Sequence, residues 1–338
     1  MQLEKNLREN IKSTILKFEF AKANEIIQQA QSKAMTNSPV WFDFEIFKAY
    51  IEFVKHSLLS KNEAFIQLGT SLENFEKLIN KMKEKKYTDG LHWADYYKGL
   101  CIYSQAIAKN DDEALFKEAE EIWFNLENSI IDGSDYLLIA ELYLSKSLLY
   151  ERYAKKNLRP VHFDEHIVID FAIETMLDKV QEQFFRLLLE ITPVEDSELK
   201  MRLNYATARS KSLKQEKLGR MREDLTKSGN IKIDSLGTIS YYFLTARKYA
   251  QELGAAYFMC AIPLQLCKII SKYIYESLSL EPPPDLDFRT KLFTEEIKEC
   301  LNNCKKYNIA FIAEQAVDLL TKVRDELLKS NIKIQINI

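Results

Sequence analysis

The stretch that decides the fold runs from Leu236 to Tyr273 and reads LGTISYYFLTARKYAQELGAAYFMCAIPLQLCKIISKY. Its apolar residues recur three and four positions apart, as they do on the buried face of an amphipathic helix. They are Phe243, Ala246 and Ala250 before Gly254, and Tyr257, Ala261, Leu264 and Ile269 after it. Glycine accepts the left-handed backbone conformation in which many helices end. The stretch therefore predicts an antiparallel helical hairpin that turns at Gly254.

The same pattern recurs nearer the C-terminus at a constant offset. Phe243, Ala246, Ala250 and Gly254 correspond to Ile297, Cys300, Cys304 and Asn308. Asparagine is the usual second choice at a left-handed helix cap, so the turn positions also correspond. Self-similarity of this kind is typical of stacked hairpins. The alternative is that any two amphipathic hairpins share a rhythm of bulky and small residues.

The composition favours an all-α fold. Only 8 of the 338 residues are glycine and 7 are proline, whereas 46% are hydrophobic and 29% are charged. Strands would need more turn residues than this, while long amphipathic helices need many charges on their exposed faces.

Charge and cysteine usage indicate an intracellular protein without a membrane span. The formal net charge of −3 provides no general attraction to nucleic acid or to anionic lipid. The N-terminal residues lack the apolar core of a secretory signal, and no run reaches the roughly 18 apolar residues of a membrane span. Five cysteines, an odd number, lie within apolar helical patterns. Free thiols in a reducing compartment explain them best, and we expect a cytoplasmic location.

Two other segments show the aromatic, small, bulky order of a particular helical repeat. The first has Phe20, Ala23, Ile27 and Ala30, and the second has Phe116, Ala119 and Trp123. Both resemble the second helix of a tetratricopeptide repeat (TPR), although Asp112 stands where that family prefers alanine. The resemblance implies a right-handed α-solenoid of stacked antiparallel hairpins with a groove for peptides. Fold-level likeness of this kind does not fix function.

The predicted organisation is a hairpin array over 1–280, a proline-rich linker over 281–287, a closing hairpin over 288–330 and a tail over 331–338. Local signals place helix boundaries within it. Thr88-Asp89-Gly90 indicates a break between helices, Asp111 is a candidate N-cap, and Asp196 or Ser197 is a candidate cap further on.

One motif is compatible with metal chemistry. His162, Glu165 and His166 match the H-x-x-E-H pattern of the inverted zincins, in which two histidines bind zinc and the glutamate polarises its water. The resemblance covers only these five positions and lacks the family's mixed α/β context. The simpler interpretation is a helix start whose acidic residues complement the helix dipole.

A strongly basic helix is the best candidate for a partner-binding surface. Between residues 200 and 227 the basic residues outnumber the acidic ones, and the partner-binding candidates are Arg202, Arg209, Lys211, Lys214, Lys217, Arg220 and Arg222. Such a helix can bind an acidic peptide or the phosphates of a nucleic acid. The same segment also has an apolar stripe. The alternative is therefore a helix that packs on the core through this stripe and exposes its basic face to solvent.

Four of the cysteines form two pairs with helical spacing, Cys260 with Cys267 and Cys300 with Cys304. Four thiolates can bind zinc, but the short C-x2-C knuckles of such sites are absent. Because Cys300 and Cys304 occupy small-residue positions of the repeated hairpin, core packing is the favoured interpretation.

The sequence thus predicts a non-enzymatic interaction scaffold or adaptor. Its expected partner is a protein or peptide, an acidic one where it meets the basic helix, within a larger complex and without a cofactor or a membrane. The alternatives are a zinc-dependent hydrolase using His162, Glu165 and His166, and nucleic-acid binding through residues 200–227.

Overall fold

The fold was determined from a computed structural model. The structure describes residues 3–130, 135–162, 169–187, 191–225, 234–279 and 285–330, and the side chains of residues 170, 184, 185, 214–225 and 234–237 lie outside that description. The predicted tail over 331–338 and most of the predicted linker are outside it as well.

The protein is all-α in every described segment. Its helices are α1 (Lys5–Leu16), α2 (Phe20–Gln31), α3 (Pro39–Val54), η1 (Lys55–Leu58), α4 (Lys61–Lys85), α5 (Thr88–Ala108), α6 (Glu113–Ile130), α7 (Tyr136–Lys156), α8 (Ile169–Leu187), α9 (Pro193–Leu225), α10 (Asp234–Leu253), α11 (Ala256–Leu278), α12 (Leu286–Tyr307) and α13 (Ala310–Lys329). Helices adjacent in sequence pack against one another, most extensively α4 on α5, α7 on α8, α9 on α10 and α11 on α12. The prediction of an all-helical fold with paired neighbours is confirmed.

The hairpin predicted at Gly254 is confirmed. Gly254 adopts φ +64° between the end of α10 and the start of α11, and Ala255 N donates to Ala250 O at 2.8 Å. The corresponding residue of the second copy, Asn308, adopts φ +55° between α12 and α13. Both turns therefore use the left-handed conformation that the two residue types were expected to provide.

Replacing Gly254 with alanine is expected to lower the free energy of unfolding by about 1–2 kcal/mol, because a Cβ disfavours the left-handed conformation. The added Cβ would also lie 3.2 Å from Cγ of Lys17, which is tighter than most such contacts. Asn308→Gly serves as the control, since glycine adopts the observed φ without strain. Urea denaturation measures both variants, and an unchanged midpoint for Gly254→Ala would contradict the role assigned to this turn.

Three predicted boundaries are wrong. Thr88-Asp89-Gly90 is the first turn of α5, and the preceding helix ends at Lys85, followed by Lys86 with φ +56°. The N-cap oxygen before α6 belongs to Asp112, which accepts from Ala114 N and Leu115 N at 3.0 and 3.2 Å. Asp111 pairs instead with basic residues of α7.

The start of α9 also differs from the prediction. The helix begins at Pro193, before Asp196 and Ser197, and Thr192 caps it. Glu195 N donates to Thr192 Oγ1 at 3.2 Å, and Thr192 N donates to Glu195 Oε2 at 3.0 Å. This is a reciprocal capping box, which satisfies two backbone donors at once. Its signal is Thr-x-x-Glu followed by a helical pattern, with Pro193 at the first helical position.

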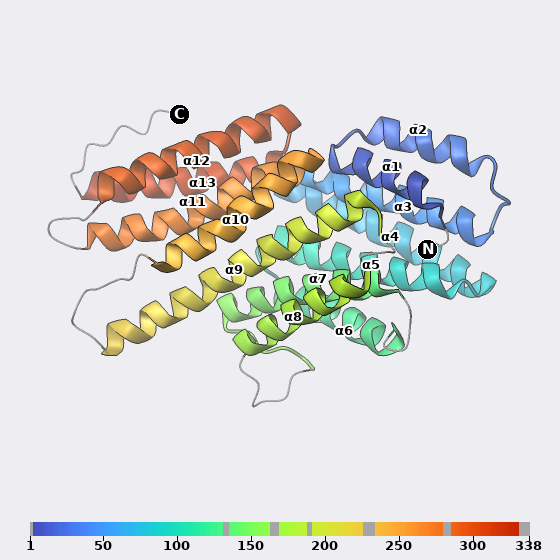
Figure 1. Cartoon of the computed structure of the whole chain (residues 1–338), viewed down its shortest axis with the longest axis horizontal. Helices are drawn as coiled ribbons and strands as arrows, with labels where there is room; N and C mark the ends of the chain where they lie inside the picture. Colours follow the sequence, from blue (N-terminus) through green and yellow to red (C-terminus); the bar gives the residue numbers. More distant parts are fainter. Residues whose placement is uncertain are drawn as a thin grey trace.

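The helices form an inner and an outer set. The inner set consists of the odd-numbered helices, which contact one another in succession from α3 to α5, from α5 to α7 and from α7 to α9, while α11 contacts α13. Tyr205 of α9 meets Phe258 of α11 with ring centroids 5.5 Å apart. In Figure 1, the long α9 crosses the middle of the molecule between the α5–α8 group and the α10–α13 group.

The first and last described helices pack against distant parts of the array. Helix α1 contacts α9, and α13 contacts η1. Lys61 N, at the start of α4, donates to Glu314 Oε2 of α13 at 3.4 Å. Phe18 and Leu58 pack on the apolar cluster of α11, α12 and α13. The inner helices therefore surround a space instead of forming an open row.

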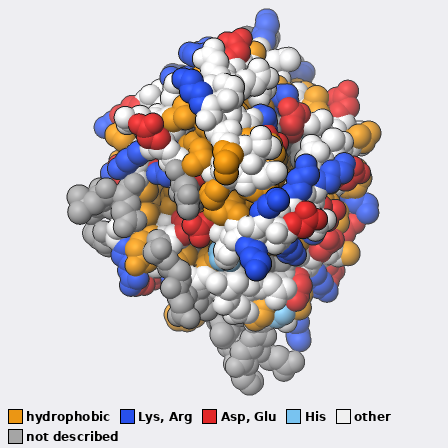
Figure 2. Space-filling view, turned by 90° about the vertical axis from the view of Figure 1, so that its right-hand side faces the viewer, with side chains coloured by type: hydrophobic (Ala, Val, Ile, Leu, Met, Phe, Trp, Pro, Cys, Tyr) orange, Lys and Arg blue, Asp and Glu red, His pale blue; other side chains and the backbone are white. Residues whose placement is uncertain are grey.

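The surface carries charges of both signs. Viewed from the end at which α1 to α3 lie, apolar side chains gather near the middle of the face, with basic and acidic side chains around them (Figure 2). Within the described segments, every helix is too short or too polar to cross a membrane.

Candidate functional site

A cavity of about 280 Å³ lies between the inner helices. Residues from α1, α3, α5, α7, α9, α11 and α13 line it, together with η1. Among the even-numbered helices, α4 contributes Ala64 to the wall. We call this space the central cavity. Its walls come from segments that span nearly the whole sequence, so only the assembled array can form it.

One part of the central cavity is apolar and aromatic. The side chains that form this part are Tyr50, Phe53, Trp93, Tyr97, Leu100 and Phe258. The rings of Tyr50 and Tyr97 lie 4.7 Å apart, and Tyr97 also packs near Phe75 and Trp93. Nearby, burial lowers the pKa of His56 to about 4, so this imidazole is neutral at physiological pH. Apolar groups can pack against these rings. The charged side chains of Glu141 and Glu198 also line the cavity. Burial raises the pKa values of Tyr50 and Tyr97, and these two carboxylates act in the same direction.

The other part of the cavity is polar and rich in positive charge. Arg152 of α7 and Arg209 of α9 line it, next to the phenol groups of Tyr103 and Tyr205. Arg209 Nε lies 2.7 Å from Glu151 Oε2, and its guanidinium carbon lies 5.5 Å from the Tyr205 ring centroid. Arg209 is therefore held in place by a carboxylate and by an aromatic ring at once.

Carboxylates in this region are shared between several cations. Glu151, almost completely buried, pairs with Arg209 and with Lys155. Burial opposes the ionisation of Glu151, but Arg209 and then Lys155 outweigh it and lower its pKa to about 2. Asp111 is shared in the same way, 3.4 Å from Arg152 Nη1 and 3.4 Å from Lys156 Nζ.

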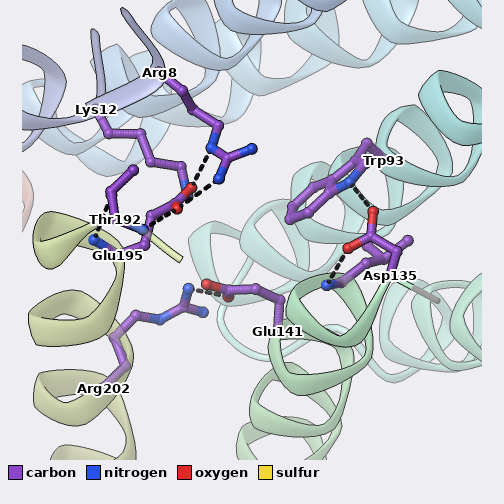
Figure 3. Close-up of polar contacts among 9 residues, drawn as sticks. Arg8, Lys12, Trp93, Asp135, Glu141, Thr192, Glu195 and Arg202 are labelled. Carbon is purple, nitrogen blue, oxygen red and sulfur yellow. Dashed lines mark hydrogen bonds and ion pairs between the residues drawn. The ribbon is translucent and has the colours of Figure 1, made fainter. Parts of the chain in front are cut away.

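A second, more polar cavity of about 380 Å³ adjoins the central cavity, and Lys12, Trp93 and Tyr97 line both. Figure 3 shows polar contacts around the two cavities: Arg8 and Lys12 point from α1 toward Glu195, and Trp93 points toward Asp135, beside the second cavity. Arg202 points toward Glu141, and both line the central cavity. Burial opposes ionisation of Glu195, but Lys12 and Arg8 outweigh it and lower its pKa to about 2. These ion pairs join α1 to α9 and α9 to α7 along the cavity wall.

The predicted partner-binding residues fall into separate groups on α9. Arg202 and Arg209 face inward, where they pair with Glu141 and Glu151 of α7 and line the central cavity. Lys211 is exposed, with Nζ 5.6 Å from the Tyr242 ring centroid. The side chains of Lys214, Lys217, Arg220 and Arg222 lie outside the described residues. An acidic ligand would reach Arg202 and Arg209 through the cavity, and partner binding at these seven positions stays a prediction.

The zinc motif is described at His162 alone, since Glu165 and His166 lie outside the described residues. The His162 ring stacks on Phe124 with centroids 3.8 Å apart, and its Nε2 lies 2.5 Å from Glu121 Oε2. These contacts hold His162, which follows α7, against the side of α6. Across the part of the chain that the structure describes, no three His, Cys, Asp or Glu side chains are arranged to hold a metal ion.

The cysteines are all free thiols buried among the helices. Cys300 Sγ of α12 donates to Cys260 O of α11 at 3.4 Å, and Cys267 Sγ lies 3.8 Å from Phe293 O. Burial raises the pKa of the Cys267 thiol. Cys260, Cys267, Cys300 and Cys304 therefore pack between α11 and α12, where small side chains let the two helices approach closely.

Sequence reasoning did not identify the central cavity. The sequence pattern placed Tyr257 in a buried helical stripe, and it indicated no role for the lining residues Tyr103, Arg152 and Tyr205. A signal was present on α5, where Trp93, Tyr96, Tyr97, Leu100, Tyr103, Ser104 and Ile107 form one stripe that mixes aromatic rings with hydroxyl groups. A purely structural core stripe contains fewer such polar tips, because each buried hydroxyl needs a partner.

Comparison with protein-family models and with curated proteins found no match to this sequence. The central cavity and its walls are therefore the basis for the functional argument.

Proposed function

We propose that this chain is a TPR-like helical-repeat protein, a right-handed α-solenoid of antiparallel hairpins, that acts as an interaction scaffold. In this proposal an extended segment of a partner protein binds in the central cavity. The single observation that carries the proposal is that the odd-numbered helices provide almost the entire cavity wall. Repeat arrays bind their ligands on the surface that one helix of each hairpin presents, and the wall has that construction.

The chemistry of the wall supports a peptide ligand. An extended peptide carries apolar side chains, which need an apolar surface, and unpaired backbone N–H and C=O groups, which need hydrogen-bond partners. The aromatic part of the cavity can contact the apolar side chains of the peptide. Ser104, Gln265 and Gln315 supply side-chain donors and acceptors along the same wall. The adjoining polar cavity adds a space of about 380 Å³ next to the central cavity.

Filling the cavity is expected to weaken peptide binding without disturbing the fold. Ser104 is half-buried on α5 and its side chain lines the cavity, so Ser104→Phe places a ring in the space proposed for the ligand. Peptides selected from a random displayed library with the unmodified protein should lose at least about tenfold in affinity for the variant, which corresponds to 1.4 kcal/mol. Fluorescence anisotropy measures the dissociation constants.

Thr70→Phe is the matched control. Thr70 is exposed on α4 and does not line the cavity, so this variant should bind the selected peptides as the unmodified protein does. Circular dichroism must show the same helix content in all three proteins. Equal affinity of Ser104→Phe and the unmodified protein, or a library from which no peptide is selected, would contradict the proposal.

A further inference from the structure

The polar end of the central cavity contains more positive charge than its own carboxylates balance. Arg152 and Arg209 line the cavity there, and Lys268 lies next to it, bonded to the lining residue Gln315. The carboxylates in contact with the two arginines are Asp111 and Glu151, and each of them also pairs with an exposed lysine, Lys156 or Lys155. Both carboxylates are already shared between two cations each. A buried surplus of charge is costly unless a counter-ion compensates it.

Lys268 is the cation that most clearly lacks a carboxylate partner. Its Nζ donates to Gln315 Oε1 at 3.2 Å, an uncharged acceptor on α13. Burial, followed by the positive charges of Arg152 and Arg209, lowers the pKa of Lys268 to about 7. The charged groups that act on it are Arg152, Lys155 and Glu151 from α7 and Arg209 from α9.

Neutral donors complete the arrangement. The phenol groups of Tyr103, Tyr205 and Tyr257 come from α5, α9 and α11 and line the same end of the cavity. Burial raises the pKa of all three, so each hydroxyl keeps its proton at physiological pH. Arginine side chains held beside tyrosine hydroxyls are a strong donor set for a planar or tetrahedral oxyanion.

We propose that Arg152, Arg209 and Lys268, with the hydroxyls of Tyr103, Tyr205 and Tyr257, form a subsite for an oxyanion carried by the ligand. The ligand is thus an amphipathic anion, whose apolar part occupies the aromatic end of the cavity and whose carboxylate or phosphate meets the cations. This inference rests on the central cavity being the binding site of the proposed function. It adds that the ligand carries a negative charge.

Binding is then linked to proton uptake. An oxyanion next to Lys268 favours the ammonium form and raises the pKa of Lys268 from its value of about 7 in the free protein. Below pH 7 the ammonium is already present, so affinity is highest there. As the pH rises from 7 toward 9, the free protein loses the Lys268 proton, and affinity falls by up to about tenfold per pH unit.

Isothermal titration with three six-carbon probes tests the inference: hexanoate, hexyl phosphate and the neutral hexanol. Both anions should bind at least about tenfold more tightly than hexanol. Their measured heat at pH 7.5 should change with the ionisation enthalpy of the buffer, because binding takes up a proton. A tighter affinity for hexyl phosphate than for hexanoate assigns the subsite to phosphate, and the reverse order assigns it to carboxylate.

Lys268→Met is the decisive variant, since it removes the charge without leaving a carboxylate unpaired. It should weaken the binding of both anions about tenfold, leave hexanol binding unchanged and abolish the dependence of the heat on the buffer. Lys248→Met, at an exposed position of α10, is the control and should behave as the unmodified protein.

Equal affinity for hexanol and for the anions, or unchanged anion binding and proton uptake in Lys268→Met, would overturn the oxyanion subsite. The proposed peptide function is tested separately by Ser104→Phe. Selected peptides that bind the cavity with no dependence on Lys268 would refute the subsite alone. Anions that bind as described, with no peptide selected, would refute the peptide ligand alone.

Discussion

Replacing Glu195 with glutamine is expected to lower the free energy of unfolding by about 3–5 kcal/mol, because the change leaves two nearly buried cations without their carboxylate. The Glu195 side chain is fully buried, and it lies 2.8 Å from Arg8 Nε and 3.2 Å from Lys12 Nζ. It also accepts from Thr192 N in the capping box of α9. One substitution therefore weakens the contact between α1 and α9 and the start of α9 together.

The loss of unfolding free energy in Glu195→Gln should depend on pH in a defined direction. The pKa of Glu195 is lowered in the folded protein to about 2, from its ordinary value of 4.5. A carboxyl with a lowered folded pKa contributes its full stabilisation above the unfolded pKa and loses it as the pH falls through the folded value. The difference between the unmodified protein and Glu195→Gln should thus be constant above about pH 5 and shrink between pH 4.5 and pH 2.

Urea denaturation at several pH values measures this prediction. Glu182→Gln is the control, because Glu182 pairs with Arg186 on the surface of α8 and both side chains are more than half exposed. An exposed pair of this kind contributes less than about 0.5 kcal/mol. A loss for Glu195→Gln no larger than that of the control would show that the α1–α9 contact does not stabilise the fold.

The packing of Trp123 against Gly99 leads to the second large effect. Trp123 is fully buried on α6, and its Nε1 donates to Tyr96 O of α5 at 3.3 Å. Trp123→Ala is expected to lower the free energy of unfolding by about 3–5 kcal/mol, through lost contacts and the cavity that remains. Gly99 lies directly under the indole, since a Cβ at Gly99 would be 2.2 Å from Trp123 Nε1.

Gly99→Ala alone should therefore cost about 1–3 kcal/mol, because the indole must move. In the Trp123→Ala background the same change should cost nothing further, since the clashing ring is gone. Gly69→Ala is the matched control within α4: its nearest neighbour would be Gln105 Nε2 at 3.6 Å, and we expect a gain of about 0.5–1 kcal/mol from the better helix residue. Independent, additive losses at Gly99 and Trp123 would contradict this contact.

The features that the sequence predicts correctly are those that depend on a few adjacent residues. The turn at Gly254 follows from its backbone freedom and from helical stripes on both sides, and the structure has this turn. The break expected at Thr88-Asp89-Gly90 fails because tertiary packing overrides local propensity. Gly90 is buried in the first turn of α5 beneath Tyr87, whose ring lies only 2.3 Å from the position of an added Cβ.

The central cavity depends on contacts between residues far apart in the sequence, which no local pattern reveals. Arg202 and Arg209 have the spacing of an exposed basic face, yet they point inward because Glu141 and Glu151 stand opposite them on α7. The stripe on α5 was equally compatible with a filled core. Only the arrangement of all the inner helices around a common space decides between these interpretations.

The contact of α13 with η1 also limits how such a chain can change over evolutionary time. An open array can lengthen by duplicating a hairpin, because the new copy stacks on a free end. Here α1 lies against α9 and α13 lies against η1, so a hairpin duplicated between these helices would have to separate helices that are now in contact. Duplication inside the array would thus change the central cavity as well as the length of the chain, whereas a substitution on the cavity wall would leave these helix contacts in place.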